Sequence, residues 1–307
     1  MDNIRTVLNW ALDDRDVELG ARLVAALREF WYWNGFLSES VTWLDTALDS
    51  EGKLSPAIRA KTLNTSSRLA FARGDYADGE HLVRQALSLA HSIDDKEYYA
   101  WSLLILGSHL MGSYDKIKQA MAYTEEGLGL FRKQDHKLGI SFGLNLLGEL
   151  ARLDGDYRSA GQHYEECLDL SINMGDRQRE AISIGNLSYI AYHLGQFDKA
   201  IDYCKKALAL EGALQMEYQC AITLAQLAGP IGAHGDPKLA ACLLAASETQ
   251  IEAMGASVQP ADKLEVDQFK NAVREQLGET EFNKAWAEGR AMTMEQALAI
   301  AVGETVA

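Results

Sequence analysis

Apolar residues recur along most of the chain at intervals of three and four, which places them on one face of an α-helix. The clearest example is a pair of such stripes separated by a polar turn: Leu144, Leu147, Leu150 and Ala151, then Tyr157, Ala160, Tyr164, Cys167 and Leu168. In the Gly-Asp turn between them, glycine can end one helix in the left-handed conformation and aspartate can cap the next. Strand-like alternation rich in Val, Ile and Thr is absent, so the pattern predicts antiparallel helix pairs in an all-α chain.

This helix pair repeats about every 40 residues. The segment GDYRSAGQHYEECLDL at 155–170 aligns without a gap with GQFDKAIDYCKKALAL at 195–210. Looser copies begin at four other glycines: Gly35, Gly74, Gly112 and Gly235. The leucines that close the apolar stripes are spaced 39, 41, 40 and 40 residues apart, at Leu48, Leu87, Leu128, Leu168 and Leu208. This regularity predicts a repeat array whose units stack in chain order.

The repeated motif combines a small residue in the first helix, a Gly-Asp or Gly-Gln turn followed by an aromatic residue, and an alanine in the second helix. The small residues are Ser67, Gly107, Gly148 and Ser188, and the alanines include Ala160 and Ala200. The motif resembles the tetratricopeptide repeat (TPR), in its long variant of about 40 residues. That resemblance implies a right-handed superhelical solenoid of antiparallel helix hairpins. The second copy departs from it, because Gly79 stands where the alanine is expected.

A second resemblance covers the two ends of the chain. Residues 2–48, which include FWYWNGFLSESVTWLDTAL, and the segment FNKAWAEGRAMTMEQALAIAV at 282–302 resemble the two ends of the repeat region in bacterial STAND and LuxR-type signalling ATPases that regulate transcription. The chain contains no GxxxxGK[ST] motif and no basic helix-turn-helix. The resemblance implies a sensor segment that works with an attached or partner NTPase domain. The alternative is a stand-alone TPR adaptor that binds a peptide segment of another protein.

The repeats also predict the organisation of the chain. We expect N-terminal helices and a degenerate first repeat in residues 1–54, the TPR-like array in residues 55–254, and a C-terminal helical cap in residues 255–307. The cap is expected to begin with a helix at Pro260, a favoured first position, followed by two shorter helices. Pro230 lies inside the first helix of the sixth pair and is expected to kink or shorten it.

The charge and composition of the chain argue against nucleic acid and membranes as direct partners. The net charge of −15 opposes nonspecific binding to nucleic acid or to an anionic membrane, and no apolar stretch approaches the roughly 20 residues of a spanning helix. The four cysteines form no CxxC pair, which indicates buried thiols in the reducing cytoplasm. We therefore expect a cytoplasmic protein that contacts neither nucleic acid nor membrane directly.

The sequence offers no arrangement typical of an active site. Its seven histidines never form HxxxH or HExxH, and the acidic pair Glu165–Glu166 falls on a polar helix face. The glycines lie at turns and helix contacts, and no strand precedes them to form a phosphate-binding loop. The sequence predicts a protein without catalytic activity, metal or cofactor.

The first helices of stacked pairs are expected to line a concave groove. By register, the residues facing this groove are Asn64, Arg68, Trp101, Asn145, Glu149, Arg152, Asn186, Tyr189 and Tyr192. Amide and guanidinium donors beside aromatic walls suit a peptide, a protein segment or a small effector. The other interpretation is an ordinary wetted face, with Glu149 and Arg152 as a surface pair one helical turn apart.

The segment EFWYWNGF at 29–36, together with Trp43, concentrates aromatic residues near the N-terminus. They either pack the core of the first helix pair or form a docking surface for an upstream domain, since the end of a solenoid exposes apolar area unless it is covered.

Overall fold

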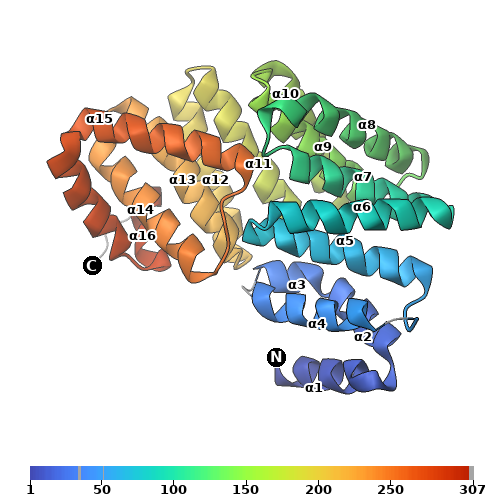
Figure 1. Ribbon diagram of the computed structural model, residues 1–307. Helices are drawn as coiled ribbons and strands as arrows, with labels where there is room; N and C mark the ends of the chain where they lie inside the picture. The colour runs from blue at the N-terminus through green and yellow to red at the C-terminus, as the bar shows by residue number, and fades with distance from the viewer. Residues whose placement is uncertain (34–35, 51, 304–307) are drawn as a thin grey trace. The chain divides into compact units, whose positions relative to one another are not determined.

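The computed structural model describes residues 1–33, 36–50 and 52–303, without the side chains of residues 14, 29, 32 and 33. Every regular element in these ranges is helical, which confirms the predicted all-α class (Figure 1). The chain forms two compact units, Met1–Leu146 and Leu147–Ala307, called unit 1 and unit 2. In each unit the helices pack against their neighbours in chain order.

Unit 1 begins with short helices and continues into long antiparallel pairs. Its helices are α1 (Asp2–Trp10), α2 (Val17–Ala26), α3 (Arg28–Trp33), α4 (Leu37–Asp49), α5 (Pro56–Arg73), α6 (Tyr76–Ser92), α7 (Lys96–Leu110) and α8 (Ile117–Lys133). A π-helical turn at Ala11–Arg15 follows α1, and a 3-10 turn at Tyr114–Lys116 precedes α8. Helix α5 pairs with α6 and α7 pairs with α8, as the repeat predicts.

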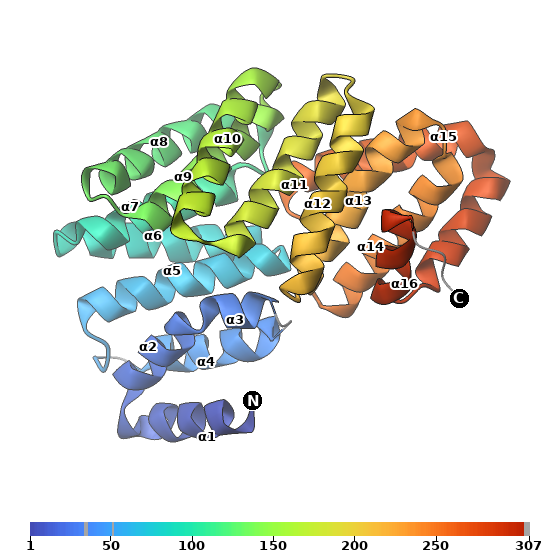
Figure 2. The same ribbon diagram turned by 180° about the vertical axis from the view of Figure 1, so that it is seen from behind.

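Helix α9 (Lys137–Leu153) begins in unit 1 and ends in unit 2. It is followed by α10 (Tyr157–Met174), α11 (Arg177–His193), α12 (Phe197–Ala213), α13 (Glu217–His234), α14 (Pro237–Ala253), α15 (Pro260–Arg290) and α16 (Met294–Val302). Within unit 2, consecutive helices from α10 to α15 lie side by side, and α16 packs on α13 and α14 (Figure 2). From α5 to α13 each odd-numbered helix is the first of a pair, and first helices also touch each other, as α5 touches α7 and α11 touches α13. We call the surface that they share within each unit its first-helix face.

The Gly-Asp turns at Gly155 and Gly235 have the predicted geometry, whereas the Asp75 side chain does not cap α6. Gly155 adopts a φ of +81°, which closes α9, and the Asp156 carboxylate accepts a hydrogen bond from the Ser159 backbone N–H at 3.0 Å, which caps α10. The turn at Gly235, with a φ of +113°, precedes α14 in the same way. These caps satisfy backbone groups that a helix end leaves without intrahelical partners.

Small residues allow close contact between the helices of a pair, as predicted. A side chain at Gly148 would collide with the ring of Tyr164, which lies against it. At Gly79, a β-carbon would collide with the ring of His109. The imidazole therefore fills the space that the alanine occupies in other repeats, and this explains why the second copy departs from the motif.

The aromatic residues near the N-terminus contribute to the core of unit 1. Trp31 is fully buried, and its indole N–H donates to the Val24 carbonyl at 2.9 Å. Its ring centroid lies 5.4 Å from that of Trp43. The core-packing interpretation is confirmed for Trp31, whereas the side chains of Tyr32 and Trp33 lie outside the described residues.

The C-terminal helices begin where the sequence predicts. Helix α15 starts at Pro260, and the non-helical backbone at Gly278 (φ 73°, ψ 161°) divides it into two segments, so that three cap helices result with α16. Pro230 does not shorten α13, which continues to His234. The ring of Phe269 from α15 packs against Gly229, where a β-carbon would lie 2.6 Å from it.

The four cysteines are buried, as expected. Among the described residues, no helix is both long and apolar enough to cross a membrane.

Candidate functional site

Three half-buried side chains form a group on the first-helix face of unit 1: Arg68 from α5, Trp101 from α7 and Phe142 from α9. The Arg68 guanidinium lies over the Phe142 ring, with its Cζ 4.6 Å from the ring centroid. The Trp101 ring meets Phe142 edge-on at 5.8 Å between centroids and meets His136 at the same separation. The group combines a cation with flat apolar surfaces, which suits recognition of a peptide or a ring-bearing effector.

The two asparagines predicted for unit 1 lie in different environments. Asn64 is buried between α5 and α7, where its amide donates to the Tyr98 carbonyl at 3.4 Å and accepts from the Ser102 hydroxyl at 3.0 Å. Asn145 is half-buried on α9. Asn64 therefore holds the two first helices together, whereas Asn145 lies at the partly exposed face.

In unit 2, Arg152 is held by α15, the helix that follows the last pair of the array. One guanidinium nitrogen donates to Asp262 Oδ1 at 2.9 Å and another to Glu265 Oε1 at 3.1 Å. The guanidinium also stacks 3.9 Å from the centroid of the Tyr189 ring. The Arg152 side chain is only 1% exposed, so this is a buried ion triad and not the surface pair with Glu149 that was the alternative interpretation.

Glu265 has a second partner on α11. The Nε2 atom of His193 lies 2.9 and 3.0 Å from the two Glu265 oxygens, and the imidazole stacks on Tyr157 with centroids 3.9 Å apart. Burial would raise the pKa of Glu265, but the hydrogen bond from His193 and the charge of Arg152 outweigh it and hold the pKa below its ordinary value. Burial raises the pKa of Asp262, which Arg152 offsets only in part.

An aromatic contact continues this interaction along α15. Phe269 is 3% exposed and meets Tyr192 edge-on with centroids 4.9 Å apart. Val273, one turn further on, lies against Gly232 of α13. Small residues on α13 thus make room for large side chains of α15.

The predicted groove residues divide between the units. Unit 1 contains Asn64, Arg68, Trp101 and Asn145, and unit 2 contains Glu149, Arg152, Asn186, Tyr189 and Tyr192. In unit 2 the structure brings Arg152, Tyr189 and Tyr192 together beneath α15, whereas Asn186 is buried in α11 and Glu149 is half-buried on α9.

The sequence prediction missed the residues that complete both groups. Phe142 and His136 surround Trp101 in unit 1, and Asp262, Glu265 and Phe269 cover the face in unit 2. The last three are spaced at i, i+3 and i+7, which identifies one face of a helix. That spacing does not reveal a partner more than 100 residues away.

A serine and a histidine meet between α5 and α7, but their geometry is structural. The Ser67 hydroxyl donates to the Gly79 carbonyl at 2.7 Å and lies 2.8 Å from His109 Nε2. Because its proton is used by the carbonyl, the hydroxyl accepts from the imidazole and does not lose a proton to it. Burial lowers the pKa of His109 to about 4, which keeps the ring neutral at pH 7.

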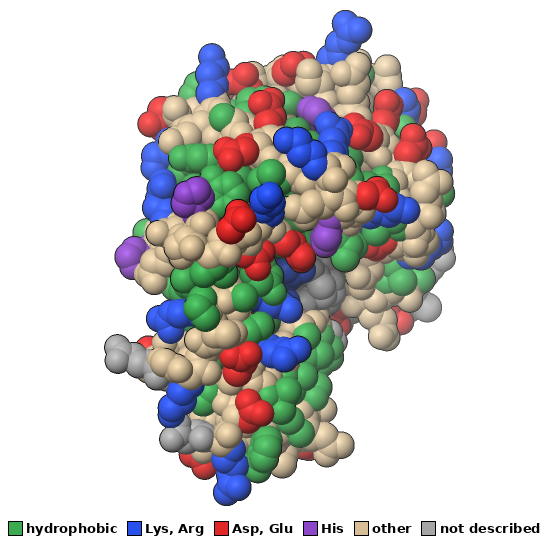
Figure 3. All heavy atoms as spheres, turned by 90° about the vertical axis from the view of Figure 1, so that its right-hand side faces the viewer, with side chains coloured by type: hydrophobic (Ala, Val, Ile, Leu, Met, Phe, Trp, Pro, Cys, Tyr) green, Lys and Arg blue, Asp and Glu red, His purple; other side chains and the backbone are tan. Residues whose placement is uncertain are grey.

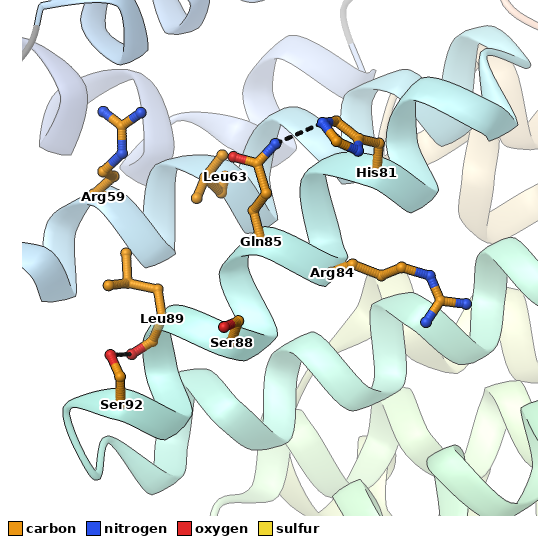
Figure 4. Close-up of a pocket in the computed structure, with 8 residues that line it drawn as sticks. All are labelled: Arg59, Leu63, His81, Arg84, Gln85, Ser88, Leu89 and Ser92. Atoms are coloured by element: carbon orange, nitrogen blue, oxygen red, sulfur yellow. Dashed lines mark hydrogen bonds between the residues drawn. The ribbon is translucent and has the colours of Figure 1, made fainter.

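A recess of about 560 Å³ lies between α5 and α6 (Figure 4). It is lined by Arg59, Leu63, His81, Arg84, Gln85, Ser88, Leu89 and Ser92. Arg59 donates to the Leu48 carbonyl at 2.9 Å, Arg84 pairs with Glu80 at 2.6 Å, and His81 bonds Gln85 at 2.8 Å. These polar groups already have partners, so the recess has the character of a wetted groove.

Figure 3 shows no concentration of Lys and Arg on the face that it displays. On the face displayed in Figure 3, acidic and basic side chains are interspersed with hydrophobic ones. Within the described ranges, no cluster of His, Cys, Asp and Glu side chains is arranged to hold a metal ion.

Comparison with known sequences agrees with this architecture. Residues 140–211 match the model of the tetratricopeptide repeat family. Over 185 residues, or 58% of its length, the chain is 25% identical to proteins named as HTH-type transcriptional regulators in Mycobacterium bovis and Mycobacterium tuberculosis. The chain spans about a fifth (21%) of the length of these relatives.

Similar solved structures cover nearly the whole chain. A Rap protein complexed with competence and sporulation factor has a TM-score of 0.67 at 12% identity, over 97% of this chain and 85% of that one. NprR in complex with its cognate peptide NprX has a TM-score of 0.65 at 17% identity, over 95% of this chain and 83% of that one. A STAND protein with a tetratricopeptide repeat sensor from Pyrococcus horikoshii has a TM-score of 0.57 at 16% identity, over 96% of this chain and 45% of that one. Residues 140–211 therefore match the tetratricopeptide repeat family, and the chain has the all-α fold of TPR-like helical solenoids, similar to that of a STAND protein with a tetratricopeptide repeat sensor.

Proposed function

We propose that this chain is a non-catalytic scaffold whose first-helix face binds a peptide or small effector, and that it is the sensor segment of a bacterial transcriptional regulator or signalling ATPase. The observation that carries the proposal is the half-buried group of Arg68, Trp101 and Phe142 on unit 1. A cation stacked on one ring beside a second ring provides both a charge and flat apolar surface for a ligand.

Two of the similar structures were solved with a bound partner, and in one of them the partner is a peptide. The Rap protein was solved with competence and sporulation factor and NprR with its cognate peptide NprX. The sequence relatives support the regulatory role, because they are named as transcriptional regulators and are several times longer than this chain. An attached NTPase domain is part of the proposal.

The mechanism that we propose is a population shift. Arg68, Trp101 and Phe142 come from three successive first helices, so a ligand that contacts all three favours the arrangement of α5, α7 and α9 that fits it. The ligand can change the state of an attached domain only by the difference in its affinity for the two arrangements.

Selection of a random peptide display library on the immobilised full chain tests this function. We expect enriched peptides whose dissociation constant rises about tenfold or more in Arg68→Met, which removes the charge but keeps the apolar stem, since a partly desolvated cation contributes on the order of 1 to 2 kcal/mol. Arg132→Met, an exposed position on α8, serves as the matched control and should leave binding unchanged. Absence of enrichment, or equal binding to Arg68→Met, contradicts the proposal.

A further inference from the structure

We propose that the first segment of α15, residues 260–277, is a displaceable internal ligand of the first-helix face of unit 2. The external ligand that replaces it is a peptide that carries two carboxylates and an aromatic ring at the same helical spacing. This inference rests on the proposed peptide-binding function and names the ligand class for one part of the face.

Helix α15 contacts helices well before its neighbours in the chain. As the helix after α14, it packs along α14 and α13, its neighbours in the array. Its first turns also reach α11 through Glu265 and α9 through Asp262, so they cross the face of two earlier pairs. Figure 1 shows the start of α15 beside α11. A helix that only closed the array would need no contact beyond the last pair.

The contact at the start of α15 differs in chemistry from the packing between α13 and α14. The α13–α14 pair is packed with small apolar residues such as Ala225, Ala228 and Ala241. The contact at the start of α15 instead uses a guanidinium, an imidazole, two carboxylates and several aromatic rings. Hydrogen-bonded charges fix the register and orientation of the two surfaces that meet, as they do where a protein recognises a ligand. A buried ion pair adds little net stability over an apolar replacement, so this contact is better suited to recognition than to stabilising the fold.

The same chemistry defines the competing ligand. Arg152 stands between Asp262 and Glu265, while Tyr189 and Tyr192 contact Phe269, which also covers Gly229. An external segment needs equivalents of the three α15 side chains, at i, i+3 and i+7, to satisfy these groups. If α15 left without replacement, Arg152 would lose both of its ion-pair partners.

The connection before α15 allows such an exchange. No helix is present from Gly255 to Gln259, and Gly255 has a φ of +61°. The hydroxyl of Tyr218 donates to the Ser257 carbonyl at 2.9 Å and anchors the middle of this connection. A tether this short keeps α15 at a high local concentration, so a free peptide must compete with it.

The test uses the full chain and a fluorescein-labelled synthetic peptide of residues 259–274, QPADKLEVDQFKNAVR. In the variant Asp262→Asn/Glu265→Gln, the tethered helix lacks the carboxylates that the peptide still has. We expect fluorescence anisotropy to show at least tenfold tighter peptide binding to this variant than to the wild type. Addition of the peptide should also speed hydrogen–deuterium exchange of residues 260–277 in the wild-type chain.

Two further variants make the result specific. Asp267→Asn alters the exposed ion pair with Lys263 on the same helix and should bind the peptide as the wild type does. Arg152→Met, added to the double variant, should abolish binding. If circular dichroism shows that the double variant is unfolded, Glu265→Gln alone is used for the same comparison.

Equal affinity of the wild type and the carboxylate variant for the peptide, or no binding to either, overturns the inference. So does exchange of residues 260–277 that is as slow as exchange in α13 and α14 with saturating peptide present. These results do not depend on Arg68, so failure here is distinguishable from failure of the display selection on unit 1.

Discussion

Glu211 is a fully buried carboxyl group on α12, and its effect on stability can be predicted from its surroundings. Its Oε1 accepts a hydrogen bond from the Thr223 hydroxyl at 3.0 Å, while Oε2 has no hydrogen-bond partner among the described residues. Burial raises the pKa of Glu211 to about 8, and the bond from Thr223 offsets this only in part. The folded protein therefore holds this carboxyl group neutral at pH 7.

The direction of the pH effect follows from proton binding. In the unfolded chain Glu211 loses its proton near its ordinary pKa of 4.5, whereas in the folded chain it keeps the proton up to about pH 8. Between these values the unfolded state binds fewer protons, so this group lowers the stability of the protein as the pH rises. The full difference corresponds to roughly 4 to 5 kcal/mol at pH 8 and above.

Glu211→Gln removes this titration and keeps an oxygen for Thr223. We expect the variant to match the wild type within about 1 kcal/mol at pH 5 and to be more stable by several kcal/mol at pH 8. Urea unfolding of both proteins from pH 4.5 to 8.5 measures the difference, with Glu275→Gln at an exposed position of α15 as a control that should show no such trend. A stability difference for Glu211→Gln that stays constant over this range would mean that the folded protein does not hold Glu211 neutral at pH 7.

Three further predictions concern packing and reactivity. Gly79→Ala should destabilise the protein by about 1 to 3 kcal/mol in urea unfolding, because the new methyl group collides with the His109 ring, and an unchanged midpoint contradicts this contact. Phe269→Ala should cost about 3 to 5 kcal/mol in the same assay, because the ring is 3% exposed, and a loss below about 1 kcal/mol means that α15 does not pack as described. Iodoacetamide should leave Cys204 and Cys220 unmodified in the native protein at pH 8 and modify them in urea. The reason is that burial raises the pKa of each thiol to about 12. Rapid labelling of the native protein contradicts this burial.

The helix pairs were predictable because the information that defines them is local. Helical spacing of apolar residues, glycine at the turns and aspartate at the caps all act within a few residues, and Gly155 and Asp156 behave as predicted. The repeat then fixes which helices are neighbours. The start of α15 at Pro260 was visible for the same reason.

The candidate site was only partly predictable because its contacts are long-range. Register placed Arg152 on the first-helix face, but nothing near it in sequence shows that Asp262 covers it, 110 residues later. Burial of Asn64 likewise depends on how closely α7 approaches α5. Glu211 lies at i+4 and i+7 from the stripe residues Ala207 and Cys204, so periodicity could have identified it as a buried acid.

The proposed function requires that ligands bind the first-helix face. Hydrogen–deuterium exchange along the full chain, with and without a peptide enriched on it, locates the helices that the ligand contacts. We expect the peptide to slow exchange in α5 and α7 and to leave exchange in α6 and α8 unchanged. Slower exchange confined to α6 and α8, or no change in any of the four helices, would contradict it.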